Sequence, residues 1–334
     1  MGGDYAGRKD EIMEQQRTPV ASWPTSGIVI ADAVLSSIKK KTLWPVVKLG
    51  EPLTYRPWEV IPVRVVVVKG TDLFDRRGGG RPIYHEILAQ GGIHKYLGFN
   101  GEIILSSIMP DIIVKAVTKE LYADAVNKLG VDGYFTPDGE TYLGEKHLGV
   151  YEVNRMLQET EYLLRTCTKS KPIGLVKGHD SEQMCAHANA LKALGIGNMI
   201  FHAGDFSRGA EKDETKTGVR FGKDIRRIAD TLYIYGVGSR KGLNFYSHAD
   251  GYITQNHYVN AFYRQRLVDG KWRYSGKKAD RSDIMQNLKT INKEVDDLDR
   301  AVEAMRKIPK LSRWISDSIQ ISSISSGSTS IQNR

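Results

Sequence analysis

Short apolar runs of strand length alternate with segments of helical length from about residue 60 to residue 240. The run VIPVRVVVVKG, which ends at Gly70, is rich in β-branched residues and is bounded by glycine, as buried strands are. Such an alternation implies parallel strands that are joined by crossover helices. By this pattern we expect further strands at 102–107, 131–139, 172–180, 197–205 and 231–239, and helices at 118–130, 151–167, 180–195 and 221–229.

An open doubly wound sheet and a closed (β/α)8 barrel both fit this alternation. Polar residues stand just after the expected strand ends, and in TIM barrels the active site is built at these ends. No Gly-x-Gly-x-x-Gly follows an expected strand, and the chain has no Walker A loop. We therefore expect an α/β fold of the TIM-barrel type, with these strand-end residues near its mouth: Asp138, Lys177, His179, His202, Asp205 and Asp250.

The barrel is expected to occupy residues 26–280, after a flexible polar segment at 1–25. Residues 281–310 carry apolar side chains at heptad-like spacing, which predicts a C-terminal helix. This helix either packs on the barrel or pairs with a partner helix in a coiled coil. Its apolar positions are Ile284, Leu288, Ile291, Val295, Leu298 and Val302. The remaining residues, 311–334, are rich in serine and are expected to be disordered.

The chain carries a formal net charge of +9, and its pI is about 9.3. This charge favours a polyanionic partner such as DNA, RNA or phosphate, although an ordinary basic protein has the same composition. The two cysteines, Cys167 and Cys185, form no Cys-x-x-Cys pair, which argues against a zinc ribbon and a disulfide framework. No stretch reaches the roughly 18 apolar residues of a membrane helix. We expect a cytoplasmic protein (in the host cytoplasm if the chain is viral) without membrane, metal or cofactor.

The phrase GGIHKYLGFNGEIILSS at 91–107 resembles a signature of the tRNA-guanine transglycosylases. In that family a Gly-Gly-Leu-His-Lys-Phe phrase precedes a strand that ends in Thr-Asp-Ser-Gly-Gly-Phe-Gln. Four later segments recur in the order of the family, and together they extend the resemblance over roughly residues 70–265. These segments are LGVDGYFTPD, GLVKGHD, MIFHAGD and YGVGSRKGLNFYSHADGYITQ.

The resemblance implies a barrel that exchanges a nucleic-acid base through a covalent glycosyl intermediate on a carboxylate. Asp250 falls in the segment of the family's nucleophile, and Ser106 falls at the position of a second catalytic aspartate. Asp138 matches the acid that binds the guanine edge, which it can do as a bidentate acceptor. The other expected base-binding residues are Ser107, Lys177, Gly178, His179 and His202.

Departures from the family pattern favour DNA over tRNA as the expected substrate. The zinc-binding cysteines of the tRNA enzymes are missing, and Ile253 replaces the second aspartate of the nucleophile motif. These losses resemble the phage and bacterial branch that inserts 7-deazaguanines into DNA, so we expect exchange of guanine in DNA for a free 7-deazaguanine. Exchange on tRNA, a non-catalytic nucleic-acid-binding subunit and an unrelated TIM-barrel hydrolase are the alternatives. If a second carboxylate is needed, it comes from Asp72, Asp111 or Asp205.

A base inside a duplex is out of reach, so a DNA substrate must be flipped or single-stranded. Basic and aromatic residues alternate in FYRQRLVDGKWRYSGKK (262–278), the composition of a groove that follows a nucleic-acid backbone. A solvated β-hairpin around Asp269-Gly270-Lys271 explains the same stretch. The residues expected to contact phosphates are Arg76, Arg77, Arg226, Arg227, Arg264, Arg266, Lys271 and Arg273. A homodimer or a partner subunit is left open.

Overall fold

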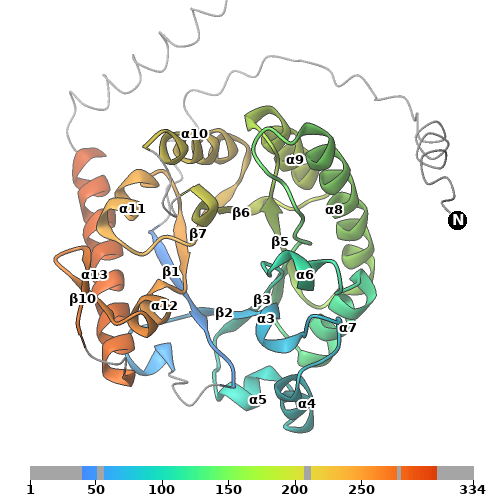
Figure 1. The fold of residues 1–334 in the computed structure, drawn as a ribbon, viewed down its shortest axis with the longest axis horizontal. Helices are drawn as coiled ribbons and strands as arrows, with labels where there is room; N and C mark the ends of the chain where they lie inside the picture. Colours follow the sequence, from blue (N-terminus) through green and yellow to red (C-terminus); the bar gives the residue numbers. More distant parts are fainter. Residues whose placement is uncertain (1–39, 51–55, 207–211, 277–279, 307–334) are drawn as a thin grey trace, which may run out of the picture.

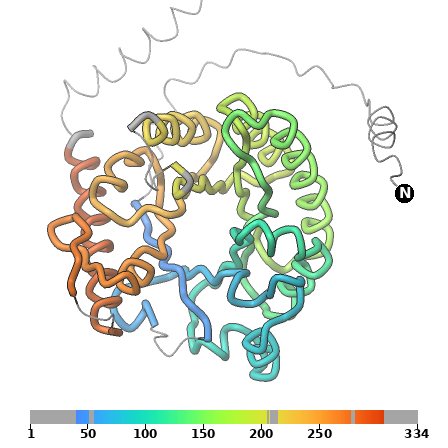
Figure 2. The backbone as a smooth tube through the Cα atoms, in the orientation of Figure 1, coloured from blue at the N-terminus to red at the C-terminus, as the bar shows by residue number. Residues whose placement is uncertain are grey.

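The computed structural model describes residues 40–50, 56–206, 212–276 and 280–306, so the expected flexible segment at 1–25 and the tail at 311–334 lie outside it. Eight parallel strands form a closed barrel, and helices surround it (Figure 1). The first strand lies beside the last, which closes the ring (Figure 2). The TIM-type α/β fold expected from the alternation of strands and helices is confirmed.

The barrel strands are β1 (Thr42–Val47), β2 (Val65–Lys69), β3 (Glu102–Ser106), β4 (Gly133–Phe135), β5 (Lys171–Val176), β6 (Asn198–His202), β7 (Thr231–Tyr235) and β8 (Gly251–Thr254). The helices are η1 (Pro57–Glu59), α3 (Gly70–Leu73), α4 (Pro82–Ala89), α5 (Ile93–Leu97), α6 (Asp111–Val114), α7 (Lys119–Leu129), α8 (Lys146–Thr166), α9 (Ser181–Ala193), η2 (Ala203–Phe206), α10 (Lys212–Ile228), α11 (Arg240–Phe245), α12 (Asn256–Phe262) and α13 (Arg281–Arg306). Strands β9 (Gln265–Val268) and β10 (Lys271–Tyr274) form a separate antiparallel hairpin.

Strand β1 contains Pro45, which has no backbone N–H to donate. Residues 42–45 of β1 pair with β8, whereas the pairing with β2 begins only at Val46. The proline therefore stands where β1 passes from one neighbour to the other, a position at which a missing donor costs little. Because proline argues against a central strand, this strand is hard to recognise in the sequence.

Side chains alternate between the barrel interior and the helix layer along each strand. The interior is filled by large apolar residues such as Trp44, Ile104, Phe135 and Ile253. The same alternation directs the last residue of several strands, or the residue just after it, toward the mouth of the barrel. These residues are Lys69, Ser106, Lys177, His202 and Gln255, and a 3.1 Å hydrogen bond from Lys69 Nζ to Gln255 Oε1 crosses the mouth.

The helices begin and end largely where sequence signals place them. The Thr118 hydroxyl accepts from the N–H of Leu121 and begins α7, and Gly130 ends it with a positive φ of 68°. The Asp180 carboxylate accepts from the N–H of Gln183 and caps the start of α9. Two predicted starts are wrong: α8 begins at Lys146 rather than 151, and α10 begins at Lys212 rather than 221.

Helix α13 packs on the barrel, as the first of the two interpretations of the heptad spacing predicted. Its residues Ile284 and Leu288 are buried beside Ile61 and Ala261. Glu294 of the same helix forms a bidentate ion pair with Arg240 of α11, at 2.6 and 2.8 Å. The expected hairpin around Asp269-Gly270-Lys271 is confirmed as β9–β10, and it packs against α13 (Figure 1). The last four residues of the predicted helix, 307–310, lie outside the described part of the chain.

Candidate functional site

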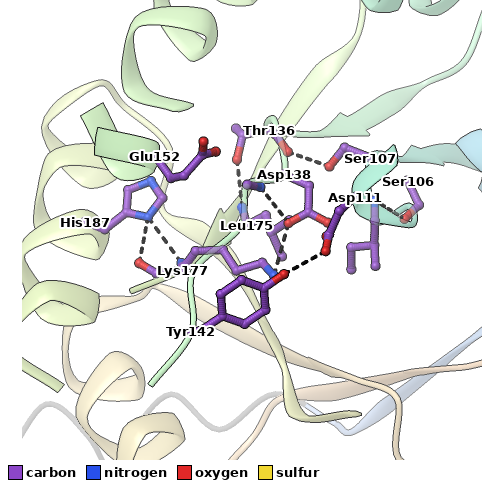
Figure 3. Close-up of polar contacts among 12 residues, drawn as sticks. Ser106, Ser107, Asp111, Thr136, Asp138, Tyr142, Glu152, Leu175, Lys177 and His187 are labelled. Atoms are coloured by element: carbon purple, nitrogen blue, oxygen red, sulfur yellow. Dashed lines mark hydrogen bonds and ion pairs between the residues drawn. The ribbon is translucent and has the colours of Figure 1, made fainter. Parts of the chain in front are cut away.

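A cavity of about 380 Å³ opens at the carboxyl ends of β4, β5 and β6, where TIM barrels build their sites. Its size falls within the roughly 300–1,000 Å³ that is typical of small-molecule pockets. Four of the residues expected to bind a base line this cavity: Asp138, Lys177, Gly178 and His202. The other charged side chains on its wall are Asp111 and Glu140. Tyr142 contributes a hydroxyl, which Figure 3 shows reaching Asp111.

Asp138 is buried and held on several sides. Its Oδ1 lies 3.1 Å from Lys177 Nζ and accepts from the N–H of Gly139 at 2.8 Å. Its backbone carbonyl accepts from Arg155 Nη2 at 2.7 Å, and the same guanidinium pairs with Glu152 and Glu159 on α8. Neighbouring elements therefore fix the turn after β4, which gives the carboxylate a defined direction.

Lys177 comes from the end of β5, where strand alternation directs its side chain toward the cavity. Its backbone contacts His187 of α9: the His187 Nδ1 lies 3.2 Å from Lys177 N and 3.1 Å from Lys177 O. Complete burial lowers the pKa of His187 to about 4, so the ring is neutral near pH 7. Gly178 is required next, because a Cβ there would lie 2.8 Å from the backbone N of Met184.

His202 ends β6 and lies on the wall of the cavity. Its ring packs edge-on against Tyr235 with 5.2 Å between centroids. Gly204 leaves room for this ring, since a Cβ at that position would come within 2.8 Å of His202 Nε2. Gly236 adopts a positive φ of 98° beside Gly204, a conformation that favours glycine.

Two links join the loop after β4 to helix α6 at the edge of the cavity. The Tyr142 hydroxyl donates to Asp111 Oδ2 at 2.7 Å, and Lys115 Nζ lies 2.7 Å from Glu140 Oε1. Asp111 and Lys115 are four residues apart, so one face of this short segment holds both contacts (Figure 3 shows Tyr142 reaching Asp111).

The structure does not bring Asp250 to this site, which corrects the nucleophile expected from the sequence. Asp250 precedes β8 and therefore lies at the amino end of the barrel. The four residues of β8, about 13 Å of strand, separate it from the mouth. Strand alternation also turns it outward: Tyr252 lies in the helix-facing core, and Ile253 lies in the interior. Its Oδ2 accepts from the N–H of Leu232 at 2.8 Å, and its Oδ1 lies 3.1 Å from Arg226 Nη2.

Three further predicted residues lie near the mouth but do not line the cavity. Ser106 is buried, and its Oγ accepts from the N–H of Ile108; Ser107 donates to the carbonyl of Thr136 at 2.6 Å. His179 is held at the start of α9, with Nδ1 2.8 Å from Gln183 Oε1 and Nε2 3.0 Å from Asp180 Oδ2. Their polar atoms are engaged in local structure, so the expectation that they contact a base receives no support.

The three carboxylates that could replace the missing acid, Asp72, Asp111 and Asp205, do not lie at one site. Asp72 is buried and fully engaged, with Lys48 Nζ at 2.7 Å and the N–H of Leu49 at 3.1 Å. It lines a different cavity of about 310 Å³, at the ends of β1 and β2. The side chain of Asp205 lies outside what the structure describes. Asp111 lines the cavity of about 380 Å³ over β4, β5 and β6.

The residues expected to contact phosphates do not form one surface. Arg76 and Arg77 are exposed after α3, on the side of the barrel mouth. Arg226 and Arg227 belong to the last turn of α10 and lie toward the opposite end, and Arg226 is committed to Asp250. The remaining four, Arg264, Arg266, Lys271 and Arg273, belong to the hairpin segment beside α13, and Arg266 pairs with Asp283 there.

The sequence phrase with which the resemblance begins has a structural role. His94 Nδ1 lies 2.9 Å from the carbonyl of Phe99, and His94 Nε2 lies 3.0 Å from Asp132 Oδ2. Asp132 also accepts from the N–H of Ile103, at the amino end of β3. Two of the resembling segments thus meet at the end of the barrel that is remote from the cavity.

Sequence reasoning missed Glu140, Tyr142, Arg155 and His187. The first two follow a strand end, which was the one available signal; the other two act on the cavity from helices. Within the described ranges, no three His, Cys, Asp or Glu side chains are grouped so that they could hold a metal ion.

Comparison of the chain with protein-family models and with curated proteins gives no match. None of the helices that the structure describes is both long and apolar enough to cross a bilayer.

Proposed function

We propose that this chain exchanges guanine in DNA for a free 7-deazaguanine base, and that the cavity over β4, β5 and β6 holds the base. The observation that supports this proposal is the pairing of Asp138 and Lys177 on the cavity wall. A guanine edge presents two donors, N1–H and the exocyclic amine, beside one acceptor, O6. A carboxylate next to an ammonium is complementary to this donor–donor–acceptor pattern.

The polar groups on the cavity wall would offer a base both an acceptor and a donor. Asp138 Oδ1 is engaged by Lys177 and Gly139, whereas among the described residues no hydrogen bond to Oδ2 is found. The acceptor that remains would take the amine and N1–H of the base, while Lys177 would donate to O6. His202 is a third polar group on the same wall and would contact the base from β6.

The net charge of +9 supports a nucleic-acid partner. The base must leave the helical stack to enter a cavity at the barrel mouth, which fits a flipped or single-stranded substrate. Arg76 and Arg77 are exposed on the side of the mouth, where phosphates next to the flipped nucleotide would pass.

A specific observation favours a second candidate, a non-catalytic subunit that binds nucleic acid. Ser106 ends β3 and Thr254 ends β8, so neither strand places a carboxylate at the mouth, and Asp250 lies at the other end. Such a subunit would bind the base in the same cavity and leave the chemistry to another chain.

A base-exchange assay tests the proposal. The purified protein is incubated with DNA labelled at guanine and with a panel of free 7-deazaguanines, and tRNA is run in parallel. Release of labelled guanine from DNA, lost in Asp138→Asn, is the expected result. Release from tRNA alone would replace DNA as the substrate. Binding of DNA and base by the wild type without any release would favour the non-catalytic subunit.

A further inference from the structure

We infer that Asp111 is the nucleophile of the exchange, an assignment that rests on the proposed function. Among the described residues that line the cavity, three are carboxylates: Asp111, Asp138 and Glu140. They differ in the group that contacts each carboxylate, a cation or a neutral hydroxyl. We use this difference to distinguish the nucleophile from the carboxylates that bind. A carboxylate already paired with a cation has less electron density to share with an electrophilic carbon.

Asp138 and Glu140 are each paired with a lysine. Lys177 Nζ lies 3.1 Å from Asp138, and Lys115 Nζ lies 2.7 Å from Glu140. Asp111 accepts a 2.7 Å hydrogen bond from the neutral hydroxyl of Tyr142, and Lys115, which pairs with Glu140, attracts it only from beyond ion-pair distance. That bond falls on Oδ2 and orients the carboxylate, which directs Oδ1 as the attacking oxygen.

The position of Asp111 also suits attack on a sugar. Asp138 and Lys177 follow the strands directly and are 7% and 14% exposed, so a base that they hold lies deep in the cavity. The sugar attached to that base then points outward, toward the edge formed by α6 and the loop after β4. Asp111 begins α6 and is exposed at this edge, where a nucleic-acid strand would cover it.

The connection between β3 and α6 can supply at Asp111 the carboxylate that is missing at Ser106. Ser106 ends β3 where the resembling family has an acid, and Asp111 follows five residues later on the same connection. The intervening segment places Asp111 beside Tyr142, at the mouth. Gly70 lies against this segment, and a Cβ there would come within 2.6 Å of Met109 Sδ.

The proposed step balances without a further reactant. Asp111 Oδ1 forms an ester bond to C1′ as the C1′–N9 bond breaks, and the bonding electron pair leaves with guanine. The incoming 7-deazaguanine loses its N9 proton and attacks C1′, which releases the Asp111 carboxylate. Guanine takes up a proton from water in the first step, and the incoming base returns a proton to water in the second, so the net change is an exchange of bases.

The experiment traps the intermediate. The protein is mixed with a guanine-containing DNA oligonucleotide without an incoming base and is then denatured, and the attached peptide is mapped by mass spectrometry. We expect the adduct on Asp111. Asp111→Asn should lose the adduct and reduce exchange by roughly three orders of magnitude, while a free 7-deazaguanine still binds with wild-type affinity. Tyr142→Phe should retain the adduct and slow exchange by about 10-fold, as expected for loss of one orienting hydrogen bond.

Glu145→Gln is the matched control, because Glu145 is an exposed carboxylate of the same loop that does not line the cavity. An adduct on another residue, or exchange by Asp111→Asn at the wild-type rate, would overturn the assignment of Asp111 and leave the proposed function standing. Absence of guanine release and of any adduct in the wild type would overturn the proposed function itself.

Discussion

Lys177 Nζ lies 3.1 Å from Asp138 Oδ1, and this ion pair joins the ends of β5 and β4 on the wall of the cavity. Both side chains are largely buried, so each compensates part of the charge of the other. A buried ion pair adds little net stability, but removal of one partner leaves a charge that neither water nor protein compensates.

Lys177→Met should therefore lower the free energy of unfolding by roughly 3 kcal/mol. The double variant Asp138→Asn/Lys177→Met should recover most of this loss, since it removes both charges. Urea denaturation of the wild type, both single variants and the double variant gives the coupling between the two residues. Additive effects of the two substitutions would show that the pair is not energetically linked.

Arg226→Met should destabilise the protein by a similar amount, roughly 3 kcal/mol, because it leaves Asp250 buried without a cation. Asp250→Asn should also lower stability, since the carboxylate accepts from Leu232 N–H at the start of β7. In protein that remains folded, this variant should keep its base affinity and exchange rate. If Asp250→Asn abolishes exchange yet retains wild-type stability and base binding, the nucleophile expected from the sequence is the right one.

His94→Ala should lower the free energy of unfolding by about 1 kcal/mol, the usual net contribution of a hydrogen bond. The effect is modest because the side chains of His94 and Asp132 are both 37% exposed. His85→Ala, at an exposed histidine of α4, is the control and should change stability by less. Equal losses in the two variants would argue against a specific role of the contact with Asp132.

Acid should destabilise the protein through its buried histidines. Burial lowers the pKa of His187 to about 4 and that of His257 to about 3 in the folded state. The unfolded chain, with pKa values of about 6.5, binds protons that the folded chain does not. The free energy of unfolding should thus fall as the pH drops from about 6.5 to about 4, by up to about 1.4 kcal/mol per pH unit for each histidine.

Denaturation curves between pH 7 and pH 4 measure this slope. His257→Asn should reduce the slope of unfolding free energy against pH by the contribution of one histidine. An exposed-site variant such as His85→Asn should have the same slope as the wild type. A slope that is unchanged in His257→Asn would mean that this residue does not contribute to the acid sensitivity.

Much of the fold could be predicted because its elements carry local signals. Glycine and capping residues bound the helices, and β-branched runs such as the one at β2 mark buried strands. Strand β1 gave no such signal, since Pro45 interrupts it and its pairing partners lie elsewhere in the sequence. The four residues of β8 are too few to show an alternation.

This shortness explains the error at Asp250. In a strand of four residues, the sequence shows neither which end an adjacent aspartate occupies nor which face it takes. Lys177 follows the six-residue β5 and His202 ends the five-residue β6, whereas Asp138 stands in the turn sequence TPDG. The structure brings all three to one cavity. Tyr142 and Arg155 could not be predicted because loop folding and helix packing, rather than strand position, carry them there.

Base exchange by the wild type and Asp138→Asn tests whether the cavity over β4, β5 and β6 holds the base, with Glu145→Gln as the control for a carboxylate outside the cavity. We expect the wild type and Glu145→Gln to release labelled guanine from DNA when a 7-deazaguanine is supplied. Asp138→Asn should bind the free base more weakly and release little guanine. Exchange at the wild-type rate and with wild-type base affinity in Asp138→Asn would contradict the claim that this cavity holds the base.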